Sequence, residues 1–120
     1  KFGRDKGAAS NSVRGIFGGG REPALLNEID YVTIASEGNA TAFGDLTSAR
    51  WMAGQTASNS TRVVFMSGIA GSGPSYSDFT NTIDFITIST TGNAQDFGDV
   101  SFKTYSGGGC SDSHGGLGGY

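Results

Sequence analysis

The residues whose side chains could carry out catalysis are few and scattered in this sequence. His114 is the only histidine and Cys110 the only cysteine, whereas a zinc site usually takes three or four Cys, His or carboxylate ligands at close spacing. No serine or aspartate is marked by its position as a partner of His114 in a nucleophilic triad. We therefore predict a protein that is not an enzyme, with no metal site and no cofactor.

Aspartates recur at matching positions in the two halves of the chain. Asp84 follows Asp30, and Asp99 follows Asp45, by 54 positions. Paired carboxylates can act as general acid and base, but recurrence in both halves favours a structural role, such as a hydrogen bond to an arginine of the adjacent unit. Asp45 with Arg14 or Arg62 would be such a pair. The residues predicted to tie the units together are Arg14, Arg50, Arg62, Asp45 and Asp99.

Features that differ between the halves are better candidates for ligand binding. The loop at residues 66–80 is six residues longer than its counterpart at residues 18–26, and insertions of this kind often lie on a binding face. Aromatic rings beside short polar groups suit carbohydrate recognition. Packing remains the alternative for Trp51, as does an exposed turn for Tyr76. The predicted ligand-binding residues are Trp51, Tyr76, Asp78 and Phe79.

An internal repeat organises the chain. Residues 27–46 and 81–100 are identical at 11 of 20 positions, and residues 10–17 match residues 58–65, 48 positions later. A third copy begins at residues 110–117. The repeat predicts one domain of 120 residues, with units at about 4–50 and 51–103 and a partial third repeat at 104–120.

Short runs of Val, Ile, Thr, Phe and Tyr between Gly, Asn and Ser predict an all-β fold. Glycine is also too frequent for long helices, at 21 of 120 residues. Each unit divides into four strands, and one extra strand follows at residues 105–111. The predicted strands are 6–10, 14–18, 28–35 and 40–46 in the first unit, and 51–57, 62–67, 82–89 and 94–100 in the second.

The third strand of each unit is apolar on both faces. Ile29 and Tyr31 point to one side, and Val32 and Ile34 to the other, because side chains alternate along a strand. A strand in a sheet with one wet face would alternate between apolar and polar residues. Sheets of four strands, each covered by neighbouring sheets and repeated about every 50 residues, predict a β-propeller. An immunoglobulin-type sandwich is the rival fold, but it does not predict the internal repeat.

The repeat resembles a kelch blade. Gly18, Gly19 and Gly20 match the glycines that end its second strand, Tyr31 its tyrosine, Phe43 its aromatic position and Arg50 its arginine. The second unit departs from the pattern, since it lacks the double glycine and has Phe85 at the tyrosine position, Phe97 at the aromatic position and Lys103 near the arginine position. The resemblance implies propeller blades and says little about function.

The segments "SNSVRGIFGGG", "EGNATAFGDL" and "TGNAQDFGDV" also resemble repeats in proteins predicted from marine and freshwater phage genomes. Those proteins look like virion structural or tail-fibre proteins. This resemblance implies a viral structural protein or adhesin, located in the virion or outside the cell.

Charge and hydropathy limit the partners. The net charge is −3, and the eight Lys and Arg residues are spread along the chain, so we expect no nucleic-acid binding. No run of about 18 apolar residues predicts a membrane span. Asn39 and Asn59 match the N-glycosylation pattern, without showing that either is modified. Cys110 is expected to be a small strand residue, with an intermolecular disulfide as the alternative.

Two blades cannot close a propeller, which takes four to eight. The chain would therefore belong to a longer propeller, form a homotrimer with six blades, or stack into an open fibre. The sequence thus predicts a structural or adhesive module that self-associates and binds other virion proteins or a host surface glycan. A microbial lectin-like propeller is the alternative, and an intracellular kelch protein-interaction domain is a weaker one.

Overall fold

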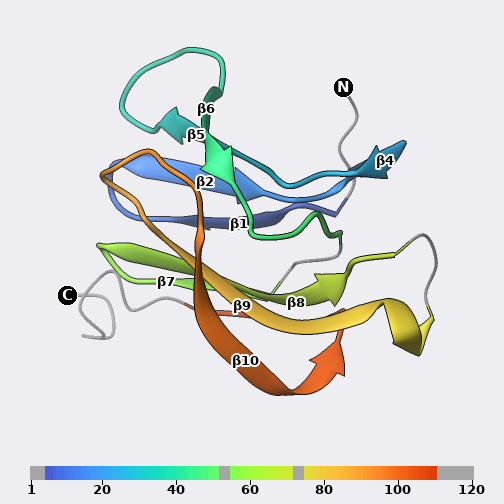
Figure 1. Cartoon of the computed structure of the whole chain (residues 1–120). Helices are drawn as coiled ribbons and strands as arrows, with labels where there is room; N and C mark the ends of the chain where they lie inside the picture. The colour runs from blue at the N-terminus through green and yellow to red at the C-terminus, as the bar shows by residue number, and fades with distance from the viewer. Residues whose placement is uncertain (1–4, 52–54, 72–74, 111–120) are drawn as a thin grey trace.

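The computed structural model describes residues 5–51, 55–71 and 75–110. Within them the chain is all-β, as predicted, with two antiparallel four-stranded sheets, a two-stranded hairpin and one short 3-10 helix. Figure 1 shows the two larger sheets lying one above the other. No helix in the described ranges is long and apolar enough to cross a membrane.

Each large sheet is a simple meander built from one sequence repeat. The first has the order β1-β2-β5-β6 and the second β7-β8-β9-β10. The strands of the first sheet are β1 (Gly7–Ser10), β2 (Arg14–Gly18), β5 (Glu28–Thr33) and β6 (Thr41–Asp45). The strands of the second sheet are β7 (Gln55–Ser58), β8 (Arg62–Ile69), β9 (Phe79–Thr87) and β10 (Gln95–Thr104).

The two sheets have the same register, strand by strand. Gly7 lies opposite Gly18, and Gln55 lies opposite Met66, 48 positions later in both strands. The third and fourth strands also match at an offset of 54, and both pairs carry a register shift beside the aromatic residue, Phe43 in one and Phe97 in the other. The sequence repeat is therefore a structural repeat.

One predicted strand is wrong. Residues 105–111 were expected to form an extra first strand, but no strand is present at residues 105–110 and β10 instead extends to Thr104. Residue 111 lies outside the described ranges, as does His114. Three of the six residues at 105–110 are glycine, which weakens a strand.

The loops between the second and third strands differ as the sequence suggested. In the first sheet this loop folds into a small hairpin of β3 (Arg21–Glu22) and β4 (Ala24–Leu25). In the second sheet the longer loop includes a 3-10 helix, η1 (Tyr76–Asp78), directly before β9.

The loop that follows the second strand starts with the same backbone conformation in both sheets. Gly19 and Gly20 have φ values of 69° and 112°, and their counterparts Ser67 and Gly68 have 60° and 117°. The second repeat thus keeps the left-handed conformation although it has lost one glycine. Glycine adopts this conformation without a steric penalty, but serine does not.

The main core lies between the two sheets. Most of its members lie on strands of the two sheets, and the others lie directly beside a strand end. Its buried members are Ile16, Ile29, Phe43 and Leu46 from the first repeat and Val63, Phe65, Ile86, Ile88 and Ala94 from the second.

Candidate functional site

The most elaborate site in the described structure is the interface between the two sheets. At its centre, Arg50 and Asp84 form a salt bridge with 3.0 Å between Nη1 and Oδ2, and both side chains are fully buried. Thr47 donates to the same carboxylate from its backbone nitrogen (3.0 Å) and its hydroxyl (2.6 Å). The connection between the sheets therefore supplies both the cation and two further hydrogen bonds to a carboxylate of the second sheet.

The carboxylate that ties the sheets is thus Asp84 rather than Asp45. Asp45 contributes its backbone to the interface, because its nitrogen donates to Asn93 Oδ1 (3.1 Å) and its carbonyl accepts from Ala94 (2.8 Å). Arg50 contacts both repeats, because its guanidinium binds Asp84 and its backbone nitrogen donates to the carbonyl of Leu26 (3.2 Å). Removing one partner of a fully buried salt bridge strongly destabilises a protein, because the other charge stays buried without compensation.

Arg14 and Arg62 occupy equivalent positions over aromatic rings. The guanidinium of Arg14 lies 4.4 Å from the centre of the Tyr31 ring, and that of Arg62 lies 4.5 Å from the centre of the Phe85 ring. Arg14 also donates from Nη1 to the carbonyl of Ile88 in the other sheet (2.7 Å). Arg14 therefore contacts both sheets, whereas Arg62 lies on the outer face of the second sheet.

Equivalent residues of the two first strands lie directly beside one another. The Thr56 hydroxyl donates to the carbonyl of Ala8 (2.5 Å), and the Ser58 hydroxyl donates to the carbonyl of Ser10 (3.0 Å). The two residues of each pair are 48 positions apart, which is the offset between the first strands of the two repeats. The second sheet is therefore placed on the first with the same strand direction and the same strand position.

The outer edges of the sheets are joined through the loop at residues 90–94. Gly92 donates from its backbone nitrogen to the carbonyl of Phe43 (2.8 Å), so this loop runs along the edge of β6. A Cβ atom on Gly44 would collide with the carbonyl of Gly92. Glycine at this position thus allows the loop of the second sheet to approach the edge strand of the first.

The sheets contact each other through different faces. Ile16 of the first sheet is buried in the interface, but its counterpart Val64 lies outside it and is only half-buried. Conversely, Ile88 of the second sheet is 0% exposed in the interface, while its counterpart Ile34 is 55% exposed. One face of the repeat therefore packs against the opposite face of the next repeat.

The four predicted ligand-binding residues gather around the longer loop of the second sheet. Trp51 donates from Nε1 to the carbonyl of Gly71 (3.2 Å), and Asp78 lies against the same glycine. Tyr76 is 68% exposed, and its ring centre lies 5.8 Å from that of Phe79. The structure thus brings Trp51, Asp78, Tyr76 and Phe79 to one end of the second sheet.

Sequence reasoning missed a fifth member of this cluster. The ring of Tyr105 lies 4.6 Å from that of Phe79. Its place at the start of the partial third repeat gave no sign that it would fold back on the longer loop. We call Trp51, Tyr76, Asp78, Phe79 and Tyr105 the aromatic cluster.

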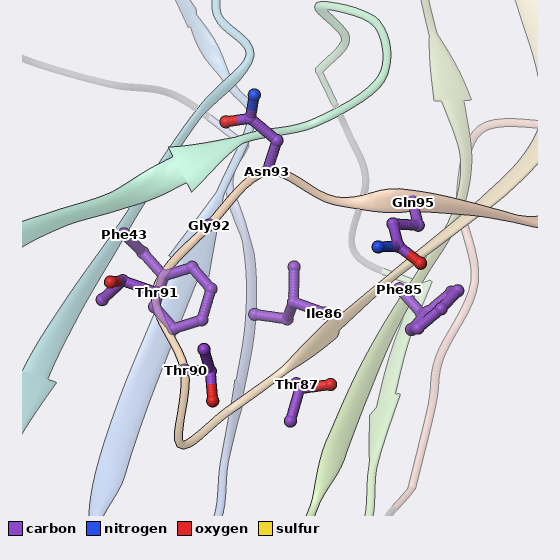
Figure 2. A pocket seen from close by; sticks show the side chains of 9 residues that line it. All are labelled: Phe43, Phe85, Ile86, Thr87, Thr90, Thr91, Gly92, Asn93 and Gln95. Atoms are coloured by element: carbon purple, nitrogen blue, oxygen red, sulfur yellow. The ribbon is translucent and has the colours of Figure 1, made fainter.

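A pocket of about 270 Å³ opens beside the loop at residues 90–94. Figure 2 shows Phe43 coming from the first sheet, while the other labelled side chains belong to the second repeat. None of its nine lining residues is charged, and hydroxyl and amide groups alternate with apolar surface. Such a lining suits a small uncharged polar molecule. The lining residues are Phe43, Phe85, Ile86, Thr87, Thr90, Thr91, Gly92, Asn93 and Gln95.

Within the described ranges, no group of three or more His, Cys, Asp and Glu residues is placed to hold a metal ion. Cys110 is exposed and is not in a disulfide. No protein-family model matches the chain, and a search of the curated proteins finds no similar sequence.

Proposed function

We propose that this chain is a non-enzymatic structural module whose two sheets are consecutive blades of a propeller-type assembly. The observation that carries the proposal is the interface between the sheets, in which the first strands lie side by side at equivalent positions. Because one face of a repeat packs on the opposite face of the next, a third sheet can pack on the second in the same way. Two sheets that packed through identical faces would leave no such face for a third sheet.

The kelch-like sequence features support the propeller form of this assembly. A four-stranded antiparallel meander is the standard blade, and blades stack around a common axis with their first strands innermost. The sheets here have this strand order. We propose a homotrimer with six blades, with an open fibre or a longer single-chain propeller as the other ways to continue the stack.

The mass in solution tests this proposal. Multi-angle light scattering of the 120-residue chain over a range of concentrations should give three times 12.3 kDa for the trimer. Masses that grow with concentration would indicate the fibre. A folded particle of 12.3 kDa at every concentration would overturn self-assembly of this chain.

The aromatic cluster supports a second, adhesive function. Tyr76 presents most of its ring to solvent beside Phe79, and Asp78 follows in the same turn. Exposed rings with adjacent polar groups bind the C–H face and the hydroxyls of sugars. We propose a surface glycan as the ligand, in keeping with the resemblance to phage fibre repeats and a location in the virion or outside the cell.

A glycan array followed by titration calorimetry tests the adhesive function. Tyr76→Ala should weaken any glycan that the chain binds, because it removes the most exposed ring of the cluster. Val13→Ala is the matched control, since Val13 is 55% exposed in the turn between β1 and β2, away from the aromatic cluster. Equal loss in both variants, or an array without binders, would count against this ligand site.

A further inference from the structure

The two outer faces of the molecule are copies of the two faces that bury each other inside it. The outer face of the second sheet carries Val64 and Phe97, which correspond to Ile16 and Phe43 of the interface. Phe43 is 4% exposed, whereas Phe97 is 54% exposed. Within the described ranges, this outer face has the residues of an interface but no sheet against it; only the segment at residues 107–110 runs against β7.

The outer face of the first sheet has the complementary character. Its Phe17, Val32 and Ile34 correspond to Phe65, Ile86 and Ile88, which are buried in the interface. Phe17 is 37% exposed, while Phe65 is fully buried. The molecule thus exposes one copy of each half of its own internal interface.

We propose that the outer face of the first sheet of a second copy docks head to tail on the outer face of the second sheet. This inference rests on the proposed assembly function and specifies its partner, the faces in contact and their polarity. Contacts between two different faces are heterologous, so they build a ring or a fibre rather than a closed dimer.

A cavity of about 320 Å³ opens on the receiving face, beside the turn between β7 and β8. Its lining includes Ala57, Arg62, Val64 and Phe97. The corresponding residues of the first sheet are Ala9, Arg14, Ile16 and Phe43. Ile16 and Phe43 belong to the same core as Ile88, and Ala9 packs against that core. We therefore assign this cavity to Ile34 of the second copy, which is the counterpart of Ile88.

Arg62 is placed to make the polar contact at this position. Inside the molecule, Arg14 lies over Tyr31 and donates from Nη1 to the carbonyl of Ile88. Arg62 lies over Phe85 in the same way. In the docked pair its guanidinium would donate to the carbonyl of Ile34 in the second copy.

The edge contact can also be repeated. The loop at residues 90–94 covers the edge of β6, where a Cβ atom on Gly44 would collide with it. At the matching position of β10, a Cβ atom on Gly98 would have nothing within 4 Å. The space beside Gly98 is therefore free for the loop at residues 36–40 of the second copy, which has the same Gly-Asn-Ala sequence.

Docking does not require a carboxylate to be buried alone. Asp30 of the first sheet corresponds to Asp84, which is neutralised by Arg50. Lys6 of the same copy already lies 3.4 Å from Asp30. The charge of Asp30 thus enters the docked interface with its own cation, which limits the desolvation penalty.

Site-directed cross-linking tests the faces and the polarity. Inside the molecule, Asn93 Oδ1 lies 3.1 Å from the backbone nitrogen of Asp45, and the equivalent pair between copies is Asn39 with Asp99. Asn39→Cys and Asp99→Cys are made separately in a Cys110→Ser background, mixed, and treated with a short bifunctional maleimide. We expect a covalent dimer that contains one copy of each variant.

The internal pair provides the control for the reach of the reagent. Asn93→Cys with Asp45→Cys in one chain should cross-link within that chain. If this control reacts and the mixture yields no dimer, or if Asn39→Cys or Asp99→Cys alone cross-links to itself, head-to-tail docking is overturned. Association by light scattering with the wrong cross-links would overturn only this docking, whereas a monomer at all concentrations would overturn the assembly function as well.

A single positive charge should prevent the cross-linked dimer. Ile34→Lys places an ammonium group in the cavity of the second sheet beside Arg62, so the 39–99 cross-link should fall at least tenfold. Ile34 is 55% exposed in one copy, so the fold should survive, as checked by circular dichroism. Ala24→Lys adds the same charge on the β3–β4 hairpin, outside both sheets, and should leave the cross-link unchanged; equal loss in both variants would contradict the proposal.

Discussion

At the scale of single residues, the most specific feature is the buried pair of Arg50 and Asp84. The guanidinium also donates from Nη2 to the carbonyl of Phe65 (3.3 Å), while Nε has no partner among the described residues. The pair joins the connection between the sheets to the middle of the second sheet. Its loss should therefore loosen the whole interface rather than a local turn.

Asp84→Asn should cost about 3–5 kcal/mol of the free energy of unfolding, because it leaves the buried charge of Arg50 uncompensated. Urea denaturation measures this loss. Asp30→Asn is the matched control, since the equivalent carboxylate pairs with Lys6 at a partly exposed position and should cost about 0–1 kcal/mol. Similar losses in the two variants would show that the buried pair has no special role.

Ser67 offers a stabilising change. It has a φ of 60°, and its buried hydroxyl has no hydrogen-bond partner among the described residues. Ser67→Gly should raise the free energy of unfolding by about 1 kcal/mol, since glycine tolerates this conformation and removes the unpaired group.

The reciprocal change provides the control in the first sheet. Gly19→Ser should destabilise, because a Cβ atom there would lie 2.7 Å from the carbonyl oxygen of Arg50. Thermal melts of both variants check the pair. A drop in the melting temperature of Ser67→Gly would contradict the strain that the backbone indicates.

The pairing of Arg50 with Asp84 could not be read from the sequence. The repeat showed which carboxylates were equivalent, but Arg50 lies in the connection between the sheets and belongs to neither strand set. Which aspartate it meets depends on how the second sheet is placed on the first. We predicted from the repeat that the carboxylate of Asp45 would pair with Arg14 or Arg62. In the structure, Asp45 joins the interface through its backbone nitrogen and carbonyl instead.

At the scale of elements, the bounds of β2 and β5, which each pair with a strand on both sides, were predicted well from the sequence. β2 was predicted with its observed bounds, Arg14–Gly18, and β5 was predicted to start at its observed first residue. The β3–β4 hairpin was missed because strands of two residues have no periodicity to detect. The segment at residues 105–110 was predicted as a strand from its place in the repeat, but Gly107, Gly108 and Gly109 disfavour a strand there.

The edge strand β6 depends on one glycine. Gly44→Ala should destabilise by about 2 kcal/mol or more, because the new methyl group meets the carbonyl of Gly92 and displaces the loop from the edge. Chemical denaturation checks the loss. Gly108→Ala is the control, since a Cβ atom there meets nothing within 4 Å, and a similar loss at both positions would contradict the edge contact.

At the scale of the whole molecule, the segment at residues 107–110 bears on assembly. It runs against β7, where Gly109 approaches the carbonyl of Thr56 too closely for any side chain. Thr56 in turn lies against the carbonyl of Ala8 in β1, to which its hydroxyl donates. The segment therefore lies where β1 of a docked second copy would lie, so it has to leave β7 when that copy docks.

Truncation after Ser106 should strengthen self-association, because β1 of the second copy is already paired with β2 and needs that place free. Sedimentation velocity of the truncated and complete chains at equal concentration measures the change. Weaker association after truncation would show instead that the segment fills the first-strand position and stabilises the assembly.

The difference in loop length has a consequence for the complete assembly. Three members of the aromatic cluster, Tyr76, Asp78 and Phe79, belong to the longer loop, which occurs in the second sheet but not in the first. A ring of three chains would therefore display three clusters on alternate blades, all turned the same way about its axis. Such spacing allows several weak contacts with a glycan-coated surface to act at once, and avidity of this kind can exceed the affinity of one site by about 10²–10⁴.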